Sequence, residues 1–170
     1  MNLTKGKCLI AYFTRKGQNY VSGRIVDLKV GNTEVVSGGD MFHIETVAAC
    51  PKDYTETTEV AKNELRAKAR PKLTGRVENM GAYDVIFLGY PNWWGTPPMA
   101  VFTFLESYDF SGKAIVPFCT HEGSGMGHSE KDIAEACPKA TILHGLAIYG
   151  SHASSAESEV SSWIDKIDIR

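Results

Sequence analysis

Long apolar runs are missing from this sequence. No stretch approaches the roughly 20 consecutive apolar residues that a membrane-spanning helix needs. The first seven residues are polar and lead directly into a strand-like segment, so we expect no secretory signal. These absences predict a protein of the cytoplasm that has no attachment to a membrane.

Strong net charge and clustered cysteines are lacking too. The net charge of −2 argues against a basic surface for nucleic acid, and it falls short of the acidity that favours docking of basic redox partners. No two of the four cysteines have the C-x-x-C spacing of metal ligands; they are Cys8, Cys50, Cys119 and Cys137. We therefore expect neither a zinc site nor an iron–sulfur cluster.

What is present is an ordinary globular composition. The 170 residues are 43% hydrophobic and 22% charged, without repeats, linkers or low-complexity tracts, which predicts one domain over residues 1–170. Largely apolar runs predict strands at residues 8–13, 41–45, 84–90, 114–119 and 141–149.

Helical segments are expected between these strands, at residues 53–70, 99–108, 129–137 and 156–167. A further short helix capped by Asn32 or Thr33 is expected, and residues 37–40 interrupt it. Alternating strands and helices predict an α/β protein: a three-layer α/β/α sandwich around a five-stranded parallel sheet of order 2-1-3-4-5.

In such a sheet, ligands bind beyond the carboxyl ends of strands 1, 3 and 4. The loop after strand 1 spans residues 14–33 and combines hydroxyls, amides, cations and glycines ahead of a helix, as a phosphate monoester requires. Its candidate binding residues are Thr14, Arg15, Lys16, Asn32 and Thr33. The alternative is an ordinary polar loop followed by a capped helix.

The loop after strand 3 holds two adjacent tryptophans. Its candidate residues are Pro91, Asn92, Trp93, Trp94 and Gly95. One tryptophan would pack in the core and the other would offer a platform to a flat ring. The alternative is that both anchor the following helix to the sheet.

The loop after strand 4 is rich in glycine and suits a backbone that closely approaches a ligand. Its candidate residues are Thr120, His121, Glu122, Gly123, Ser124 and Gly125. The spacing is neither a dinucleotide fingerprint nor a hydrolase nucleophile elbow. His121 is either a proton donor to a reduced group or a residue of the rim.

Four segments, residues 9–15, 31–34, 89–95 and 117–125, together resemble the flavodoxin family, and in particular its bacterial short-chain branch with a Trp-Trp loop. The resemblance implies a flavodoxin-like fold and a non-covalently held FMN. It places the FMN phosphate at Thr14, Arg15, Asn32 and Thr33, the isoalloxazine at residues 93–95, and its pyrimidine end at residues 120–125.

Two departures from the family pattern stand out. The phosphate motif is split by an insertion that carries Lys16, Gln18, Asn19 and Tyr20. The first helix is cut short at residues 37–40, which would expose apolar surface. Either a second copy of the chain covers this surface in a homodimer, or the protein is less stable than its relatives.

We therefore predict an FMN-dependent oxidoreductase or electron-transfer flavoprotein. Its partner would be a redox protein or a small acceptor such as a quinone. The alternative is a flavodoxin-fold binding or scaffold module that has lost FMN. A phosphoacceptor receiver domain is rejected because residues 13–14 and 90–91 hold no aspartate, and a phosphate-ester hydrolase because no nucleophile or metal cluster is evident.

Overall fold

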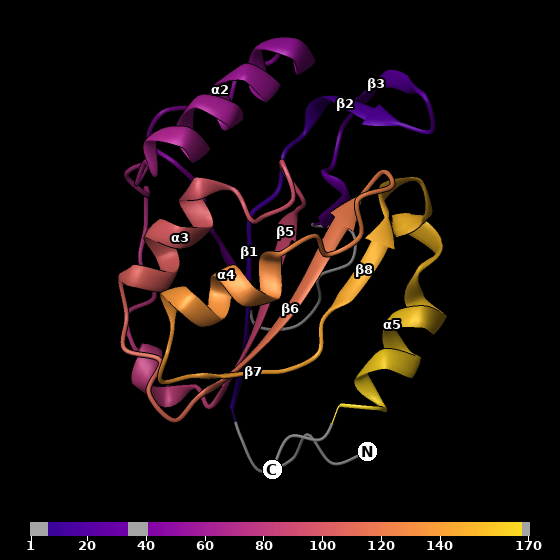
Figure 1. Ribbon diagram of the computed structural model, residues 1–170. Coiled ribbons are helices and arrows are strands. Elements are labelled where there is room, and N and C mark those ends of the chain that lie inside the picture. The colour runs from indigo at the N-terminus through magenta and orange to yellow at the C-terminus, as the bar shows by residue number, and fades with distance from the viewer. Residues whose placement is uncertain (1–6, 34–40, 168–170) are drawn as a thin grey trace.

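A parallel sheet forms the centre of the computed structural model, which describes residues 7–33 and 41–167 (Figure 1). Its main strands run in the order β4 (Met41–His43), β1 (Cys8–Tyr12), β5 (Val85–Pro91) and β6 (Ala114–His121). Beyond β6 lie two short strands, β7 (Thr141–Ile142) and β8 (Leu146–Tyr149), which both pair with β6 in parallel. Counted as one interrupted edge strand, they complete the predicted order 2-1-3-4-5, which is confirmed.

The interruption of the edge strand has a local cause. Pro117 lies in β6 between the segments that pair with β7 and β8, and a proline has no N–H to continue the ladder. A Cβ on Gly145 would lie 2.8 Å from the Pro117 carbonyl oxygen, so the chain passes very close to β6 at this point.

Both faces of the sheet are covered, as predicted for a three-layer sandwich. Ile86 and Leu88 of β5 belong to a core cluster with α3 (Met99–Glu106) and α4 (Ser129–Ala136). The alternate residues Val85 and Phe87 pack with Trp163 of α5 (Glu157–Ile164). Figure 1 shows α3 and α4 on one side of the sheet and α5 on the other. Two short 3₁₀ helices, η1 (Met80–Ala82) and η2 (Gly150–Ser155), lie in connecting segments.

The helix α2 (Tyr54–Ala67) begins and ends at recognisable caps. The side chain of Asp53 accepts a hydrogen bond from the Glu56 amide at 2.8 Å, which satisfies one of the free donors at the helix start. The helix ends at Lys68, whose φ of 48° is left-handed, three residues before Pro71. The predicted helix, 53–70, is therefore correct in kind and slightly too long.

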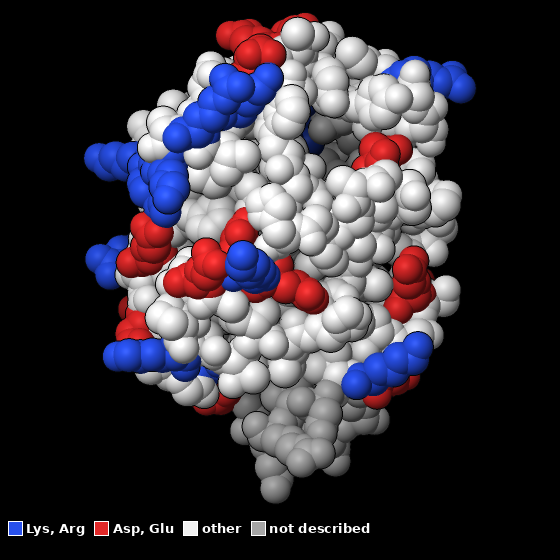
Figure 2. All heavy atoms as spheres, in the orientation of Figure 1, with Lys and Arg blue, Asp and Glu red and all other residues white. Residues whose placement is uncertain are grey.

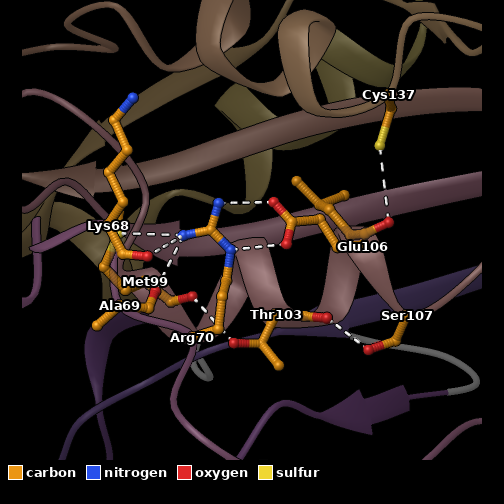
Figure 3. A network of polar contacts seen from close by, with 9 residues as sticks. Lys68, Ala69, Arg70, Met99, Thr103, Glu106, Ser107 and Cys137 are labelled. Carbon is orange, nitrogen blue, oxygen red and sulfur yellow. Dashed lines mark hydrogen bonds and ion pairs between the residues drawn. The ribbon is translucent and has the colours of Figure 1, made fainter.

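The segment that leaves α2 is tied to α3 by Arg70 (Figure 3). Its guanidinium forms two hydrogen bonds with the Glu106 carboxylate, at 2.6 and 2.7 Å, and also donates to the carbonyls of Lys68 and Ala69. This paired geometry is the stronger kind of arginine–carboxylate contact. It fixes the direction in which the chain leaves α2.

The structure corrects the prediction for residues 14–33, which are not simply a polar loop. Within them, β2 (Gly17–Val21) and β3 (Arg24–Leu28) form an antiparallel hairpin. Ser22 and Gly23 have φ values of 49° and 86°, as the two central residues of a hairpin turn with the favoured twist require. Figure 1 shows the hairpin beyond the carboxyl ends of the central strands.

Residues 34–40 are outside the described part of the chain. The expected interruption of the first helix, and with it the apolar surface that a homodimer partner would cover, lies outside the described residues. Asn32 and Thr33 already have helical conformation.

Among the described helices, none is long and apolar enough to cross a membrane. Within residues 7–33 and 41–167, no group of three or more His, Cys, Asp or Glu side chains is placed to hold a metal ion.

Candidate functional site

A cavity of about 500 Å³ lies at the carboxyl ends of the central strands. All three predicted loops contribute to it. The predicted site residues that line it are Thr14, Arg15, Asn32, Thr33, Pro91, Asn92, Trp93, Trp94, Thr120, His121 and Glu122. Figure 2 shows a hollow in the upper half of this face of the molecule, bordered mainly by uncharged residues.

Five predicted residues are not among those that line the cavity: Lys16, Gly95, Gly123, Ser124 and Gly125. Other lining residues, from the hairpin, α2 and η2, were not predicted from the sequence: Asn19, Tyr20, Tyr54, Thr57, Thr58, Glu59, Ala61 and Gly150. Asn19 and Tyr20 were visible as part of the insertion. The α2 residues carry no signal of their own in the sequence, because only the packing of α2 brings them to the cavity.

Two adjacent residues at the inner end of the cavity hold buried donors that have no partner. Among the described residues, none forms a hydrogen bond with the Thr14 hydroxyl or with Nε of Arg15. A buried polar atom without a partner costs about 1–3 kcal/mol, so such atoms generally mark a place where a ligand or water completes the bonding. The two donors together form a candidate anion site.

The rest of the Arg15 guanidinium is already engaged. Its terminal nitrogens donate to the carbonyls of Gln18, Pro51 (2.8 Å), Lys52 (2.9 Å) and Asp53 (3.3 Å). Burial lowers the pKa of this guanidinium. Arg15 therefore ties the hairpin to the start of α2, and Nε is its guanidinium nitrogen without a partner among the described residues, whereas Lys16 is exposed and does not line the cavity.

The two halves of the first loop meet beside these donors. A Cβ on Gly31 would lie 2.0 Å from the Thr14 hydroxyl oxygen and 2.7 Å from the Arg15 carbonyl, so only glycine fits there. The hydroxyls of Thr33 and Thr120 are hydrogen-bonded at 2.9 Å, which joins this loop to the end of β6. The two halves of the split phosphate motif are therefore close together in space despite the insertion between them.

The second loop contains a tight turn at Trp94 and Gly95. The amide of Trp93 donates to the Thr96 carbonyl at 3.0 Å, and the φ values of Trp94 and Gly95 are 58° and 87°. A left-handed conformation is unusual for a bulky residue such as tryptophan, and strain of this kind tends to occur at ligand clamps. The Trp94 ring is also held by a hydrogen bond from Nε1 to the Thr58 carbonyl of α2, at 3.2 Å.

The two tryptophans have different surroundings. Trp93 packs edge-on against Phe13, with ring centroids 5.4 Å apart, and it contacts the main core cluster. Trp94 is 51% exposed, and Lys62 lies over its ring at 5.1 Å from the centroid. Trp93 is therefore an anchor, whereas Trp94 leaves aromatic surface available at the cavity.

The second and third loops are bonded directly to each other. The Asn92 side chain donates to the Gly125 carbonyl at 2.6 Å and accepts from the Gly95 amide at 2.9 Å. A Cβ on Gly127 would lie 2.3 Å from the Gly95 carbonyl oxygen, and the φ of Gly127 is 57°. Gly127 thus lets the two loops approach, and Gly123, Ser124 and Gly125 are not among the residues that line the cavity.

His121 and Glu122 have defined polar contacts. Nδ1 of His121 accepts a hydrogen bond from the Gly123 amide at 2.9 Å, so the neutral ring carries its proton on Nε2. Burial lowers the pKa of His121, which favours that neutral form. The Glu122 carboxylate accepts from the amides of Ser22 and Ser151, each at 3.0 Å.

Comparison with known proteins gives a consistent assignment. The family model described as Flavodoxin matches residues 7–167. A crystal structure of a protein assigned as a flavoprotein from Bacteroides eggerthii is 27% identical, with a TM-score of 0.74 over 98% of this chain and 100% of that chain. A second crystal structure, of a protein from Bacteroides uniformis that is also assigned as a flavoprotein, is 27% identical to this chain. Its TM-score is 0.71 over 95% of this chain and 99% of that chain.

A more distant structure has the same fold. The flavoprotein from Lactobacillus acidophilus, solved in complex with FMN, is 18% identical, with a TM-score of 0.61 over 92% of this chain and 99% of that chain. At this identity the likeness extends to the fold alone. No match was found among curated proteins.

Proposed function

Because this chain belongs to the flavodoxin family, we propose that it binds one FMN non-covalently in the cavity and uses it in electron transfer. The observation that carries the proposal is a pair of buried donors at the inner end of the cavity, the Thr14 hydroxyl and Arg15 Nε, which have no partner among the described residues. A phosphate group is the part of FMN that such donors would satisfy. The FMN complex of the Lactobacillus acidophilus protein, which has the same fold, is in keeping with this proposal.

The phosphate end would be held mainly by uncharged groups. Thr14, Asn32 and Thr33 line the cavity where the chain enters a helical turn, and backbone amides at such a turn attract anions. Arg15 adds its Nε–H and a buried positive charge. Gly31 keeps the space next to the Thr14 hydroxyl free.

The ring end would lie among the second and third loops. Trp94 offers aromatic surface, and Thr120 and His121 supply polar groups at the end of β6. Bound FMN would carry one or two electrons, while the protein positions the cofactor and tunes its potential. The bonds of Asn92 to Gly95 and Gly125 hold the two loops in fixed positions around the ring.

His121 is the chain's own candidate for holding a proton at the ring end. The Gly123 amide fixes its orientation, so Nε2 carries the proton of the neutral ring. Its ring also packs against Tyr149, with centroids 4.4 Å apart. A donor held in this way can stabilise negative charge on a neighbouring group without being charged itself.

The proposed partner is a redox protein or a small electron acceptor such as a quinone, and the proposed location is the cytoplasm. The second candidate function is a flavodoxin-fold binding or scaffold module without FMN. The same buried donors argue against it, because loss of the cofactor would leave both of them unsatisfied.

The visible spectrum of the purified protein tests this proposal. We expect the two absorbance bands of oxidised flavin, and FMN in the supernatant after denaturation, identified by mass. Protein purified without flavin should regain both bands on addition of FMN. A colourless protein that also fails to take up added FMN would contradict the proposal and favour the scaffold alternative.

A further inference from the structure

The hairpin β2–β3 borders the cavity through Asn19 and Tyr20 of β2 and is fastened on both sides. On one side Arg15 bonds to the carbonyls of residues 51–53, and the Gln18 side chain accepts from the Tyr54 amide at 3.2 Å. On the other side the Ser22 amide, at the hairpin turn, donates to Glu122 of the third loop. The hairpin is therefore a fixed part of the cavity wall.

This fixed hairpin adds aromatic surface at the mouth. Tyr20 of β2 and Tyr54 of α2 both line the cavity, and their rings stack with centroids 6.1 Å apart and planes 29° apart. Tyr20 is 43% exposed and Trp94 is 51% exposed, so both rings reach the opening. Aromatic rings from three separate segments thus border the mouth beyond the inner phosphate end.

Away from the inner phosphate end, the charged groups that line the cavity disfavour a second ligand that is an anion. Among the described residues that line it, the charged ones are Arg15, Glu59 and Glu122. Arg15 is 7% exposed and its terminal nitrogens are engaged by carbonyls, so its charge lies at the inner end. The remaining charged groups of the lining are the carboxylates of Glu59 and Glu122, and a bound FMN phosphate would add further negative charge. A second ligand at the mouth should be uncharged.

We propose that the mouth of the cavity is a binding site for a second, small, planar and uncharged aromatic molecule, with Tyr20 as its main contact. The inference rests on the proposed function, since it assigns the small acceptor, rather than a protein, as the redox partner of the bound FMN. Tyr20 of the hairpin and Trp94 both line the cavity and are about half exposed, so a flat molecule can enter beside their rings.

Titration of the oxidised FMN-loaded protein with 2-naphthol tests the site. This probe is planar, uncharged at neutral pH and unable to accept electrons, so perturbation of the flavin bands and calorimetry report binding alone. We expect saturable binding of one equivalent. The replacement Tyr20→Leu should weaken it about two- to tenfold, which corresponds to the loss of one aromatic contact. Tyr20→Phe, which keeps the ring, should bind like the wild type.

Ile25→Ala is the matched control for hairpin stability. Ile25 lies directly opposite Tyr20 in the hairpin, is 51% exposed and does not line the cavity. This variant should keep the wild-type affinity for 2-naphthol. Equal weakening in Ile25→Ala and Tyr20→Leu would assign the effect to the hairpin as a whole and overturn the proposed contact.

A negatively charged probe tests whether the mouth of the cavity disfavours anions. Naphthalene-2-sulfonate has the same rings and a negative charge, so it should bind more weakly than 2-naphthol. Glu59→Gln should narrow the difference between the two probes, and equal affinity of the wild type for both would overturn the charge selection.

The outcomes separate this proposal from the proposed function. A protein that shows no flavin bands contradicts the FMN proposal itself, and the second site falls with it. A flavin-loaded protein that ignores 2-naphthol, or binds it equally well after Tyr20→Leu, overturns the second site alone. Tyr20→Leu could instead weaken the binding of FMN and leave the affinity for 2-naphthol unchanged at flavin saturation. In that case the Tyr20 ring covers the flavin, and the proposal is wrong.

Discussion

At the scale of single residues, the hydroxyl of Thr14 is the most informative atom of the cavity. It is buried, it has no hydrogen-bond partner among the described residues, and it lies beside the glycine that cannot be replaced without a clash. The Thr33 hydroxyl, by contrast, is bonded to Thr120 at 2.9 Å. Two threonines of the same loop therefore make opposite contributions to the stability of the protein without ligand.

This contrast gives a prediction for Thr14→Val. The variant should bind FMN about 10- to 100-fold more weakly, as expected for a lost hydrogen bond to a charged group, yet bind riboflavin, which has no phosphate, as the wild type does. The apoprotein should be as stable as the wild type or more stable, because an unsatisfied buried hydroxyl is removed. Fluorescence titration and denaturant unfolding measure the two effects.

Thr33→Val is the control for this prediction. It removes the bond to Thr120 and should cost the apoprotein about 1 kcal/mol of unfolding free energy. If Thr14→Val weakens riboflavin binding as much as FMN binding, the Thr14 hydroxyl does not contact the phosphate.

At the scale of elements, α2 connects the cavity with the rest of the helical layer. Its N-terminal half lines the cavity, and the segment after its C-terminal end is bonded to α3. Trp94 and Arg15 bond to backbone carbonyls of α2 and of the segment before it. Beyond its carboxyl end, Arg70 pairs with Glu106 of α3 at 2.6 Å (Figure 3). The hydrogen bond from Arg70 lowers the pKa of Glu106.

The pH dependence of this ion pair follows from that direction. A carboxylate whose pKa is lowered by folding stabilises the protein above its unfolded pKa, and the contribution is lost as the pH falls through the lowered folded value. Since the two side chains are 36% and 45% exposed, Glu106→Gln should cost only about 0.5 kcal/mol near pH 7. The difference from the wild type should shrink below about pH 4, as measured by urea unfolding across pH.

A weaker ion pair provides the comparison. Lys131 and Glu135 are 3.7 Å apart with side chains 77% and 67% exposed, so Glu135→Gln should change stability less than Glu106→Gln does. Equal losses in the two variants would show that the link between α2 and α3 adds nothing beyond a surface pair.

At the scale of the whole molecule, the cavity joins segments that are distant in the sequence. Strand ends, the hairpin, α2 and η2 all contribute lining residues, so a ligand there contacts the first, middle and last thirds of the chain. Binding of FMN to the folded state alone should therefore stabilise the protein as one unit. With free FMN at 100 times its dissociation constant, the gain is about 2.7 kcal/mol.

Thermal unfolding measures this gain. For a protein of this size it corresponds to a rise in Tm of about 5–10 °C, in a single transition. Separate transitions, with only one of them moved by FMN, would mean that the hairpin and α2 unfold independently of the sheet.

The buried strands and the caps are local properties of the sequence, and so they could be predicted from it. The runs that became β5 and β6 are apolar throughout because helices cover both faces of the sheet. The hairpin was missed although Ser22-Gly23 is a recognisable turn signal, because Gly17–Val21, the strand that pairs with Arg24–Leu28, carries too few apolar residues to indicate a strand. Their pairing depends on contacts with α2 and with Glu122 instead.

By itself, the sequence determined the buried strands, the helices between them and the three unusual loops that follow strands, because apolar runs, glycines and prolines act over short distances. Only the tertiary structure decided how the site residues are used. It engaged most of Arg15 in holding α2 and gave the Thr14 hydroxyl no partner within residues 7–33 and 41–167. It also separated the roles of Trp93 and Trp94 and stacked Tyr20 on Tyr54 at the cavity. These outcomes depend on contacts between segments far apart in the chain, which no local pattern records.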